Sequence, residues 1–295
     1  MAYTFARHET FHIRTGWLRK GLNAIDRNDH IFLETIPAMD ELGIGKNMIN
    51  SLRYWLLATK LTEECYENGQ KVQRPTELAN IIMEYDTYFE DPATFWLLHY
   101  QLAINKEEAT TWYWFFNYFN YSEFDKKTFV ERLTTYIKRT GEEPPAQSSL
   151  ESDFKVLRKM YLSKEENIDK KNKDYNPEEE LMASPFKDLR LLIETDDNKL
   201  KINRPTVDKL PVQILFYCLL ESLNKGETSI NVDDLMSKEN SIGRVFKLTP
   251  NILYTYLEQF QELNYIRLAK QAGLNSVTIL EDSQEKILEY YYLMN

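Results

Sequence analysis

Residues 75–133 contain the densest run of large aromatic side chains in the sequence, and this run limits the fold more than any other feature. Two strings stand out, DTYFEDPATFWLLHYQLA and TTWYWFFNYFN. Apolar spacing predicts one helix around residues 95–102 and a second over 112–119, with Asp91 as the cap of the first and Pro92 as its first residue. Aromatic side chains in such density usually form a packed core, which we favour over a platform for stacking nucleic-acid bases.

The rest of the composition is consistent with a helical protein. Glycine is scarce, with 9 residues, which disfavours Gly-rich phosphate loops and many-turned β architectures. The sequence has no Walker-type loop, dinucleotide fingerprint or nucleophile elbow. Cys65 and Cys218 are too few for a four-ligand zinc site and do not suggest a disulfide scaffold. The predicted fold is mainly α, with two or three helical units, winged-helix-like modules and short β-hairpin wings.

A length of 295 residues suits two or three compact units. Residues 140–184 change in character, since they contain the polar and charged strings TGEEPPAQSS and KEENIDKKNKDYNPEEE. They predict a charged linker or exposed helices. The chain is thereby divided into an N-terminal helical domain with a helix-turn-helix-like unit over residues 1–139 and a C-terminal winged-helix-like domain over residues 185–295.

The N-terminal string MAYTFARHETF lacks the pattern of a signal peptide, and no window approaches the roughly 18 apolar residues of a membrane helix. We therefore expect a cytoplasmic protein without membrane contact. The net charge of −10 opposes DNA binding, but charges beyond about 8 Å are largely screened, so their distribution matters more. Residues 1–60 carry eight Lys and Arg against six Asp and Glu, whereas the remainder carries 28 against 40. A DNA-binding surface is expected in the N-terminal part.

Residues 31–59 show the three-and-four spacing of amphipathic helices, with a break at residues 43–45. The string MDELGIGKNMINSLRYWLLATKL predicts a helix, a tight Gly-containing turn and a second helix from about Lys46. In a helix-turn-helix the second helix lies in the major groove. The polar face of this helix supplies the predicted DNA contacts, which are Lys46, Asn47, Asn50 and Arg53. The alternative is an ordinary helical hairpin with a solvated polar face.

The C-terminal part predicts helices in PVQILFYCLLESLN, INVDDLMS and TPNILYTYLEQFQELN, with a turn around residues 241–244. Two short strands follow in YIRLAKQAGLNSVTIL. A hairpin after the capped helix is the winged-helix order. Glu258 and Glu262 make the capped helix acidic, which suits protein contact better than DNA contact. Basic groups remain that are able to touch phosphates: Arg244, Lys247, Arg267 and Lys270.

The string FARHETFHIRTGWLRKGL is the densest polar cluster. His8, Glu9 and His12 match the spacing of a zinc-peptidase motif, but the motif lies at the extreme N-terminus, which argues against a peptidase. We take these three residues as candidate catalytic groups, with His8 or Glu9 as a base or metal ligand. Arg14 and Lys20 are predicted to bind phosphate oxygens. The alternative is a buried Glu9–Arg14 ion pair that only locks the N-terminus onto the first domain.

A second acidic group, formed by Asp86, Glu90 and Asp91, would bind a divalent ion if the fold brought it to His99. Capping and a solvated helix face are the favoured interpretation of these acids. His99 is favoured as a hydrogen-bonded core residue over a catalyst.

Four strings together, FARHETFHIRTGWLRKGL, LGIGKNMINSLRYWL, DTYFEDPATFWLLHYQLA and TTWYWFFNYFN, resemble a bacterial family catalogued as a domain of unknown function. Genes of that family lie beside cysteine desulfurase and sulfurtransferase genes of DNA phosphorothioation loci. The family includes the B component, the DNA-nicking one, of the Ssp system. The resemblance is close over about residues 5–130 and looser to the end.

The resemblance implies a DNA-binding, nicking subunit of a phosphorothioation modification and antiphage defence system. Its implied partners are DNA and the sulfurtransferase or cysteine desulfurase components, and a homodimer is one assembly state to test. A nicking centre would use one of two kinds of group. It is either magnesium or manganese held by carboxylate or His, or a nucleophilic Tyr. The alternative function is a non-catalytic adaptor, whose acidic C-terminal module docks the sulfur-transfer enzyme while the N-terminal unit holds DNA.

Overall fold

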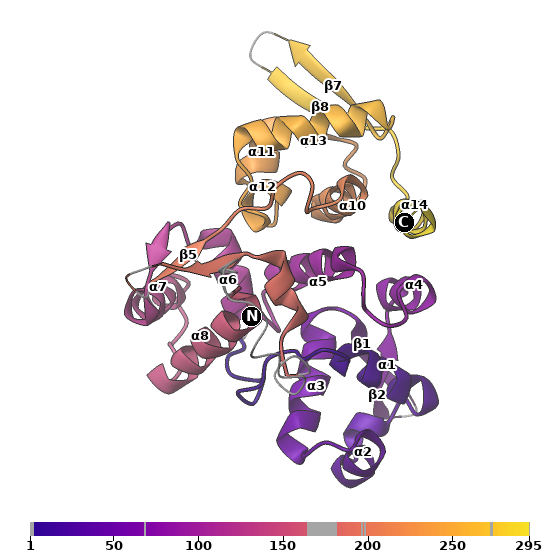
Figure 1. Cartoon of the computed structure of the whole chain (residues 1–295), viewed down its shortest axis with the longest axis vertical. Coiled ribbons are helices and arrows are strands. Elements are labelled where there is room, and N and C mark those ends of the chain that lie inside the picture. Colours follow the sequence, from indigo (N-terminus) through magenta and orange to yellow (C-terminus); the bar gives the residue numbers. More distant parts are fainter. Residues whose placement is uncertain are drawn as a thin grey trace, which may run out of the picture.

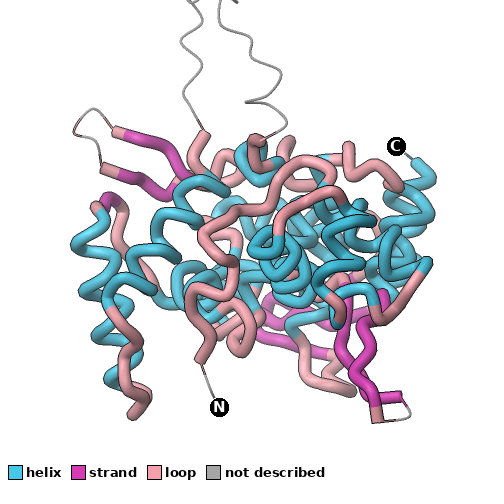
Figure 2. The backbone as a smooth tube through the Cα atoms, turned by 90° about the horizontal axis from the view of Figure 1, so that it is seen from below, coloured by secondary structure: helices cyan, strands magenta, loops and turns pink. Residues whose placement is uncertain are grey.

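The computed structural model describes residues 3–67, 69–163, 182–195, 197, 199–271 and 274–294. Helices predominate in these residues, and the strands form small antiparallel sheets (Figure 2). The predicted mainly α fold with short β elements is therefore confirmed. None of the described helices is long and apolar enough to cross a membrane.

Three helices and a β-hairpin form the N-terminal end of the molecule, in the lower part of Figure 1. The predicted helix, glycine turn and second helix are present. Gly43 ends the first of the two with a left-handed backbone (φ 61°), and its N–H donates to the carbonyl of Met39. The elements are α1 (Trp17–Arg27), η1 (Ile31–Leu33), α2 (Thr35–Leu42), α3 (Lys46–Ala58), β1 (Thr62–Glu67) and β2 (Gln70–Pro75).

The aromatic run forms the middle of the molecule, as a packed core. Trp96, Trp112 and Phe115 are all at most 1% exposed, which confirms the prediction of a core. The Asp91 side chain accepts from the N–H of Ala93 at 2.8 Å and caps the first of the core helices, again as predicted. The helices are α4 (Glu77–Tyr85), α5 (Pro92–Ile104), α6 (Thr110–Tyr118), α7 (Lys126–Arg139) and α8 (Gln147–Tyr161).

Helix α8 lies within residues 140–184, for which the sequence predicted a charged linker or exposed helices. It buries one face, including Phe154, Leu157 and Tyr161, because its apolar residues recur at a spacing of three and four. The charged string at residues 164–181 lies outside the described residues. The division of the chain into domains stays a prediction.

A small sheet that the sequence did not predict joins residues from both sides of that string. Its strands are β3 (Glu123–Phe124), β4 (Leu192–Glu194) and β5 (Leu200–Ile202), in the order β3-β5-β4, and the short helix η2 (Pro185–Leu189) precedes β4. The sheet holds Glu123 opposite Lys201, residues that are far apart in the sequence.

The C-terminal part contains the predicted helices and both predicted strands, and a third strand, β6 (Ser229–Asn231), pairs with β8 (Leu274–Ile279). The turn expected around residues 241–244 is instead a short helix, because the Ser241 hydroxyl accepts from the N–H of Arg244 and starts a helical turn. The elements are α10 (Val212–Ser222), β6 (Ser229–Asn231), α11 (Val232–Ser237), α12 (Ile242–Val245), α13 (Pro250–Glu262), β7 (Ile266–Gln271), β8 (Leu274–Ile279) and α14 (Gln284–Met294).

Helices α1–α3 and the β7–β8 hairpin lie at opposite ends of the longest axis, with α4–α8 between them (Figure 1). A continuous cluster of buried hydrophobic side chains extends from Ile13 to Tyr291. The N-terminal helices thereby rest on a rigid body, which holds their exposed faces in place.

Candidate nucleic-acid interface

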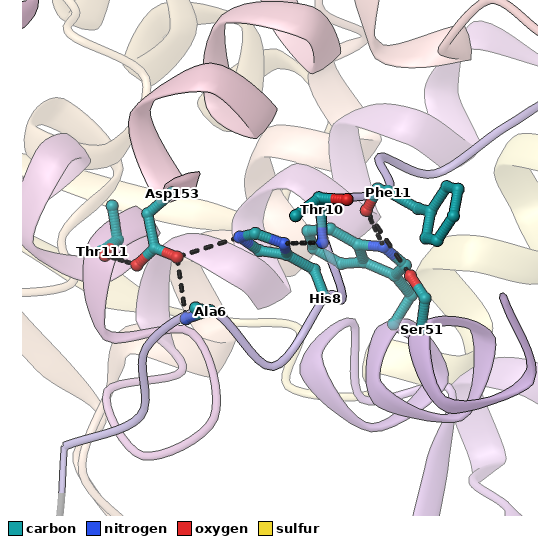
Figure 3. A network of polar contacts seen from close by, with 8 residues as sticks. Ala6, His8, Thr10, Phe11, Ser51, Thr111 and Asp153 are labelled. Atoms are coloured by element: carbon teal, nitrogen blue, oxygen red, sulfur yellow. Dashed lines mark hydrogen bonds and ion pairs between the residues drawn. The ribbon is translucent and has the colours of Figure 1, made fainter. Parts of the chain in front are cut away.

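The N-terminal cluster that the sequence singled out is a loop ahead of α1, held in place by a buried hydrogen-bond network (Figure 3). His8 is fully buried, and its Nε2 lies 2.9 Å from Oδ1 of Asp153 on α8. Its Nδ1 accepts from the N–H of Thr10 at 3.1 Å, so the ring proton lies on Nε2 and is donated to the carboxylate. The same carboxylate accepts from the N–H of Ala6 at 2.8 Å and from the hydroxyl of Thr111.

The carbonyl of Phe11 provides a second attachment of this loop. It accepts from Nε1 of Trp55 at 3.0 Å and from the hydroxyl of Ser51 at 3.5 Å, both on α3. Ile13 and Trp17 are buried beyond it. The loop is thus fixed at both ends, to α8 on one side and to α3 on the other.

This geometry differs from what a zinc-peptidase motif requires. Residues 7–10 form a turn, with Glu9 and Thr10 at positive φ (49° and 69°), so His8 and His12 do not share a helix face. His12 lies with its Nε2 at 2.7 Å from the carbonyl of Met182. Burial lowers the pKa of His12, although that hydrogen bond acts in the opposite sense. Both imidazoles are therefore engaged in contacts that hold the loop.

Glu9, in contrast, is exposed and lines a polar cavity of about 380 Å³. The cavity brings Glu9 together with Asn50 and Arg53 of α3, three residues that the sequence assigned to two separate clusters. Its lining carries three basic and three acidic groups, so it is balanced in charge. The lining residues are Arg7, Glu9, Asn50, Arg53, Tyr54, Leu57, Glu64, Lys71 and Glu108.

An ion-pair network in the wall of this cavity connects α3 to the hairpin. Glu64 on β1 accepts from both Arg53 and Lys71 of β2. Burial alone would raise the pKa of Glu64, but the hydrogen bonds from Lys71 and Arg53 outweigh it and leave the pKa below its usual value. Arg53 is therefore a paired cation, available to DNA only in competition with Glu64.

The face of α3 that the sequence assigned to DNA is open. Lys46, Asn47 and Asn50 are exposed and Arg53 is partly exposed, whereas Leu52 and other residues of the opposite face are buried. No acidic residue lies in the first turn of α3, and its cap, Gly45, provides no side-chain hydrogen bond. The free N–H groups and the positive end of the helix dipole add to the charge of Lys46 there.

Arg14 and Lys20 do not line the cavity. The Arg14 guanidinium lies over the rings of Phe11 and Trp17, at 5.5 and 5.0 Å from their centroids. The amine of Lys20 donates to the carbonyl of Leu42, the last residue of α2, at 2.9 Å. Both basic side chains therefore stabilise the local fold in this structure.

The alternative of a buried Glu9–Arg14 ion pair is not what locks the loop. Glu9 is exposed, and Arg14 packs on aromatic rings. The contact that holds the N-terminus is instead the buried hydrogen bond from His8 to Asp153. Asp153 was missed in the sequence, although it is an acid on the apolar face of a helix, between Leu150 and Leu157, which is a signal for a buried partner.

The side chains of Asp86 and Asp91, from the second acidic group, make local capping contacts and do not converge on His99. Asp86 accepts from the N–H of Glu90 at 2.8 Å and from the hydroxyl of Thr94 at 2.7 Å, and Asp91 caps α5. His99 is fully buried, with Nδ1 at 3.1 Å from the hydroxyl of Tyr161. The favoured interpretations, capping acids and a hydrogen-bonded core histidine, are confirmed.

Among the residues that the structure describes, no group of three or more His, Cys, Asp or Glu side chains is placed to hold a metal ion. Glu9, Glu64 and Glu108 line one cavity, but Glu64 is neutralised by Arg53 and Lys71. The described residues of this cavity therefore form no preassembled cluster of three carboxylate ligands.

Comparisons with known proteins agree with the fold. The model of a family described as protein of unknown function (DUF4007) matches residues 5–292. The magnesium ion-bound crystal structure of SspB is similar to this chain, with a TM-score of 0.84 and 26% sequence identity. The similarity covers 98% of this chain and 88% of the SspB chain. A further SspB crystal structure gives the same coverage and TM-score at 27% identity. No curated protein matches the chain.

Proposed function

This chain belongs to the DUF4007 family, and from that membership we propose that it is a DNA-binding subunit of a bacterial DNA phosphorothioation system. The similarity to SspB extends over 98% of the chain and supports a role in the same kind of system. The resemblance of the N-terminal strings to the phosphorothioation family supports DNA as the ligand.

The observation that carries this proposal is the exposed first half of α3. Lys46 is the first residue of the helix, where a cation opposes the helix dipole and is unfavourable for stability. The arrangement is favourable for an anion, because Lys46 and the free N–H groups of the first turn point to the same region. Asn47 and Asn50 follow on the exposed face and are able to pair with base edges, of which adenine suits an amide best.

We further propose that both ends of the chain are winged-helix modules with different roles. At the N-terminal end, α1, α2 and α3 are followed by the β1–β2 hairpin. At the C-terminal end, α10, β6, α11 and α13 are followed by β7 and β8, and β6 pairs with β8. Helix α3 presents amide and basic groups, whereas α13 presents the exposed acids Glu258 and Glu262. This contrast supports DNA contact by α3 and protein contact by α13.

For a nicking activity, Glu9 is the best candidate among the predicted catalytic residues. It is exposed, it lines the cavity beside Asn50 and Arg53, and the turn anchored by His8 fixes its backbone. His8 is a positioning residue, since both of its ring nitrogens make hydrogen bonds that hold the turn. Magnesium or manganese is part of the proposal only as a cofactor of the system.

Equilibrium binding of duplex DNA to the full chain tests the proposal. Lys46→Glu should weaken binding about tenfold or more, while the helix dipole predicts unchanged or slightly raised stability, by about 0.3–1 kcal/mol. Lys127→Glu is the matched control, because the Lys127 side chain is 80% exposed on α7. If Lys46→Glu and Lys127→Glu changed the affinity for duplex DNA equally, the assignment of DNA contact to α3 would be contradicted.

The second candidate function is the adaptor, which the acidic face of α13 favours. An adaptor holds DNA and docks the sulfur-transfer enzyme without breaking the strand. Supercoiled plasmid incubated with the protein and Mg²⁺ or Mn²⁺ separates the two: conversion to open circle supports a nicking subunit, and its absence supports the adaptor. Light scattering of the free protein tests the homodimer.

A further inference from the structure

A second pocket, of about 550 Å³, lies where the chain after α6 meets β5 and the turn after α12. Three of its lining side chains are cationic and none is acidic, although the whole chain carries a net charge of −10. The cavity that Glu9 lines beside α3 is, in contrast, balanced in charge. The lining residues are Phe119, Asn120, Tyr121, Ser122, Lys201, Ile202, Asn203, Arg204 and Lys247.

Lys247 is the innermost of the three cations. Its amine donates to the carbonyl of Phe119 at 3.1 Å. No carboxylate within ion-pair distance of this amine is found in the described part of the chain. Burial, with a smaller contribution from Arg244, lowers the pKa of Lys247 to about 7. The folded protein thus keeps an amine partly buried without the anion that would stabilise its charged form.

The other two cations, Lys201 and Arg204, are exposed and form no ion pair with any described residue. Glu123 is the cross-strand neighbour of Lys201, but it does not line the pocket and the two make no ion pair in the described structure. Both cations are therefore available to an incoming anion. The charged and titratable groups around Lys247 are Arg244, Lys201, Arg204, Glu123, Tyr121 and, from α5, the buried His99.

Polar and aromatic groups complete the lining. Asn120, Ser122 and Asn203 supply hydrogen-bonding groups beside the cations. Tyr121 is 38% exposed, and its ring centroid lies 4.9 Å from the Arg132 guanidinium and 5.2 Å from the centroid of the Phe119 ring. An exposed aromatic ring beside a cationic pocket is the arrangement that takes a base on the ring and its phosphate on the cations.

We propose that this pocket binds the phosphate group of a nucleotide, with Lys247, Lys201 and Arg204 around the phosphate oxygens and Tyr121 beside the base. The nucleotide is either free or part of a single strand, since both present the same phosphate and base. The site is independent of the proposed duplex contact, because none of its residues lies on α3 or on the β1–β2 hairpin.

Calorimetric titration of the full chain with three probes tests the proposal. The probes are sodium sulfate, thymidine monophosphate and a short single-stranded oligothymidylate. Sulfate keeps its charge over the pH range used, so a change in its affinity reports on the protein. Wild type should bind sulfate more weakly as the pH rises from about 6 to about 8, because Lys247 loses its proton in that range.

Lys247→Met keeps the apolar stem and should weaken binding of every probe that wild type binds, about tenfold or more, and abolish the pH dependence. Lys247→Arg should bind at both pH values. Lys127→Met is the exposed control and should bind as wild type does. Arg204→Ala, a change at an exposed residue, provides a second test if Lys247→Met fails to fold.

Binding of the free nucleotide identifies a free nucleotide as ligand, and binding of the oligonucleotide alone identifies a strand. Either result supports the pocket if Lys247→Met and Arg204→Ala weaken it. Wild-type affinity of these variants, or no binding of any probe to the wild type, would overturn the proposal. Duplex binding through Lys46 remains measurable in the same variants, so the two proposals fail separately.

Discussion

His8 and Asp153 are separated by 145 positions in the sequence, yet Nε2 of the imidazole lies 2.9 Å from the carboxylate, with both side chains buried. This contact ties the N-terminal loop to α8, and Trp55 and Ser51 tie the same loop to α3 (Figure 3). Through these contacts the middle of the molecule determines where Glu9 lies relative to the polar face of α3.

The first prediction concerns this contact. Asp153→Asn removes the negative charge and leaves one oxygen to accept from the three donors that now contact the carboxylate, which are His8, Thr111 and the N–H of Ala6. Hydrogen bonds to a charged group contribute about 1.5–3 kcal/mol, so the free energy of unfolding in urea should fall by about that amount. Asp208→Asn, whose side chain is 72% exposed, is the control and should change it by less than about 0.5 kcal/mol. A loss in Asp153→Asn no larger than in the control would contradict the assigned network.

The second prediction concerns stability in acid. Burial lowers the pKa of His99 from 6.5 to about 3, so the folded protein keeps this ring neutral where the unfolded chain takes up a proton. Stability from His99 is therefore full above about pH 6.5 and is lost as the pH falls toward 3. One pKa unit corresponds to about 1.4 kcal/mol, so the loss has an upper limit of about 5 kcal/mol.

His99→Phe removes the titrating group, and aromatic neighbours such as Phe116 and Phe246 surround the new ring. The variant loses the contact with the Tyr161 hydroxyl, which lowers its stability at every pH. The difference between its unfolding free energies at pH 7 and at pH 4 should nevertheless be smaller than in the wild type. Equal differences in the two proteins would show that His99 is not the group responsible.

Features with a local signal in the sequence could be predicted, whereas features that depend on pairing between distant residues could not. Helix α3 and the cap at Asp91 depend on neighbours a few residues away, and the aromatic core is indicated by a local density of large apolar side chains, so these patterns are visible in the sequence. The β3-β5-β4 sheet depends on pairing Glu123 with Lys201 through very short strands, which leave no alternating pattern to detect. The sequence therefore predicted the elements that have a local pattern and did not predict this sheet.

The candidate site shows the same limit. The exposed face of α3 follows from helical periodicity, and its four polar residues were predicted together. The role of His8 could not be predicted, because its partner Asp153 comes from α8 and its turn depends on positive φ at Glu9 and Thr10. Arg7 and Lys71 enter the cavity only because the loop and the hairpin meet in three dimensions.

The third prediction concerns Glu9 as the acid of a nicking site. The side chain is exposed, so Glu9→Gln should leave the thermal midpoint nearly unchanged, with a stability change below about 0.5 kcal/mol. If Glu9 serves as a general base, plasmid nicking should slow by about 10²–10⁴-fold. Glu107→Gln, an exposed acid that does not line the cavity, is the control. A stably folded Glu9→Gln protein that nicks at the wild-type rate would remove Glu9 from the site.

The central claim, that α3 holds DNA through its basic N-terminal end, is tested most directly by the salt dependence of duplex binding. Each phosphate neutralised by a cation contributes about 0.9 to the slope of log affinity against log salt concentration. The slope should therefore be smaller by about 0.9 in Lys46→Gln than in the wild type, and Lys127→Gln should keep the wild-type slope. Equal slopes for wild type and Lys46→Gln, or no salt-dependent binding of duplex DNA, would contradict the account.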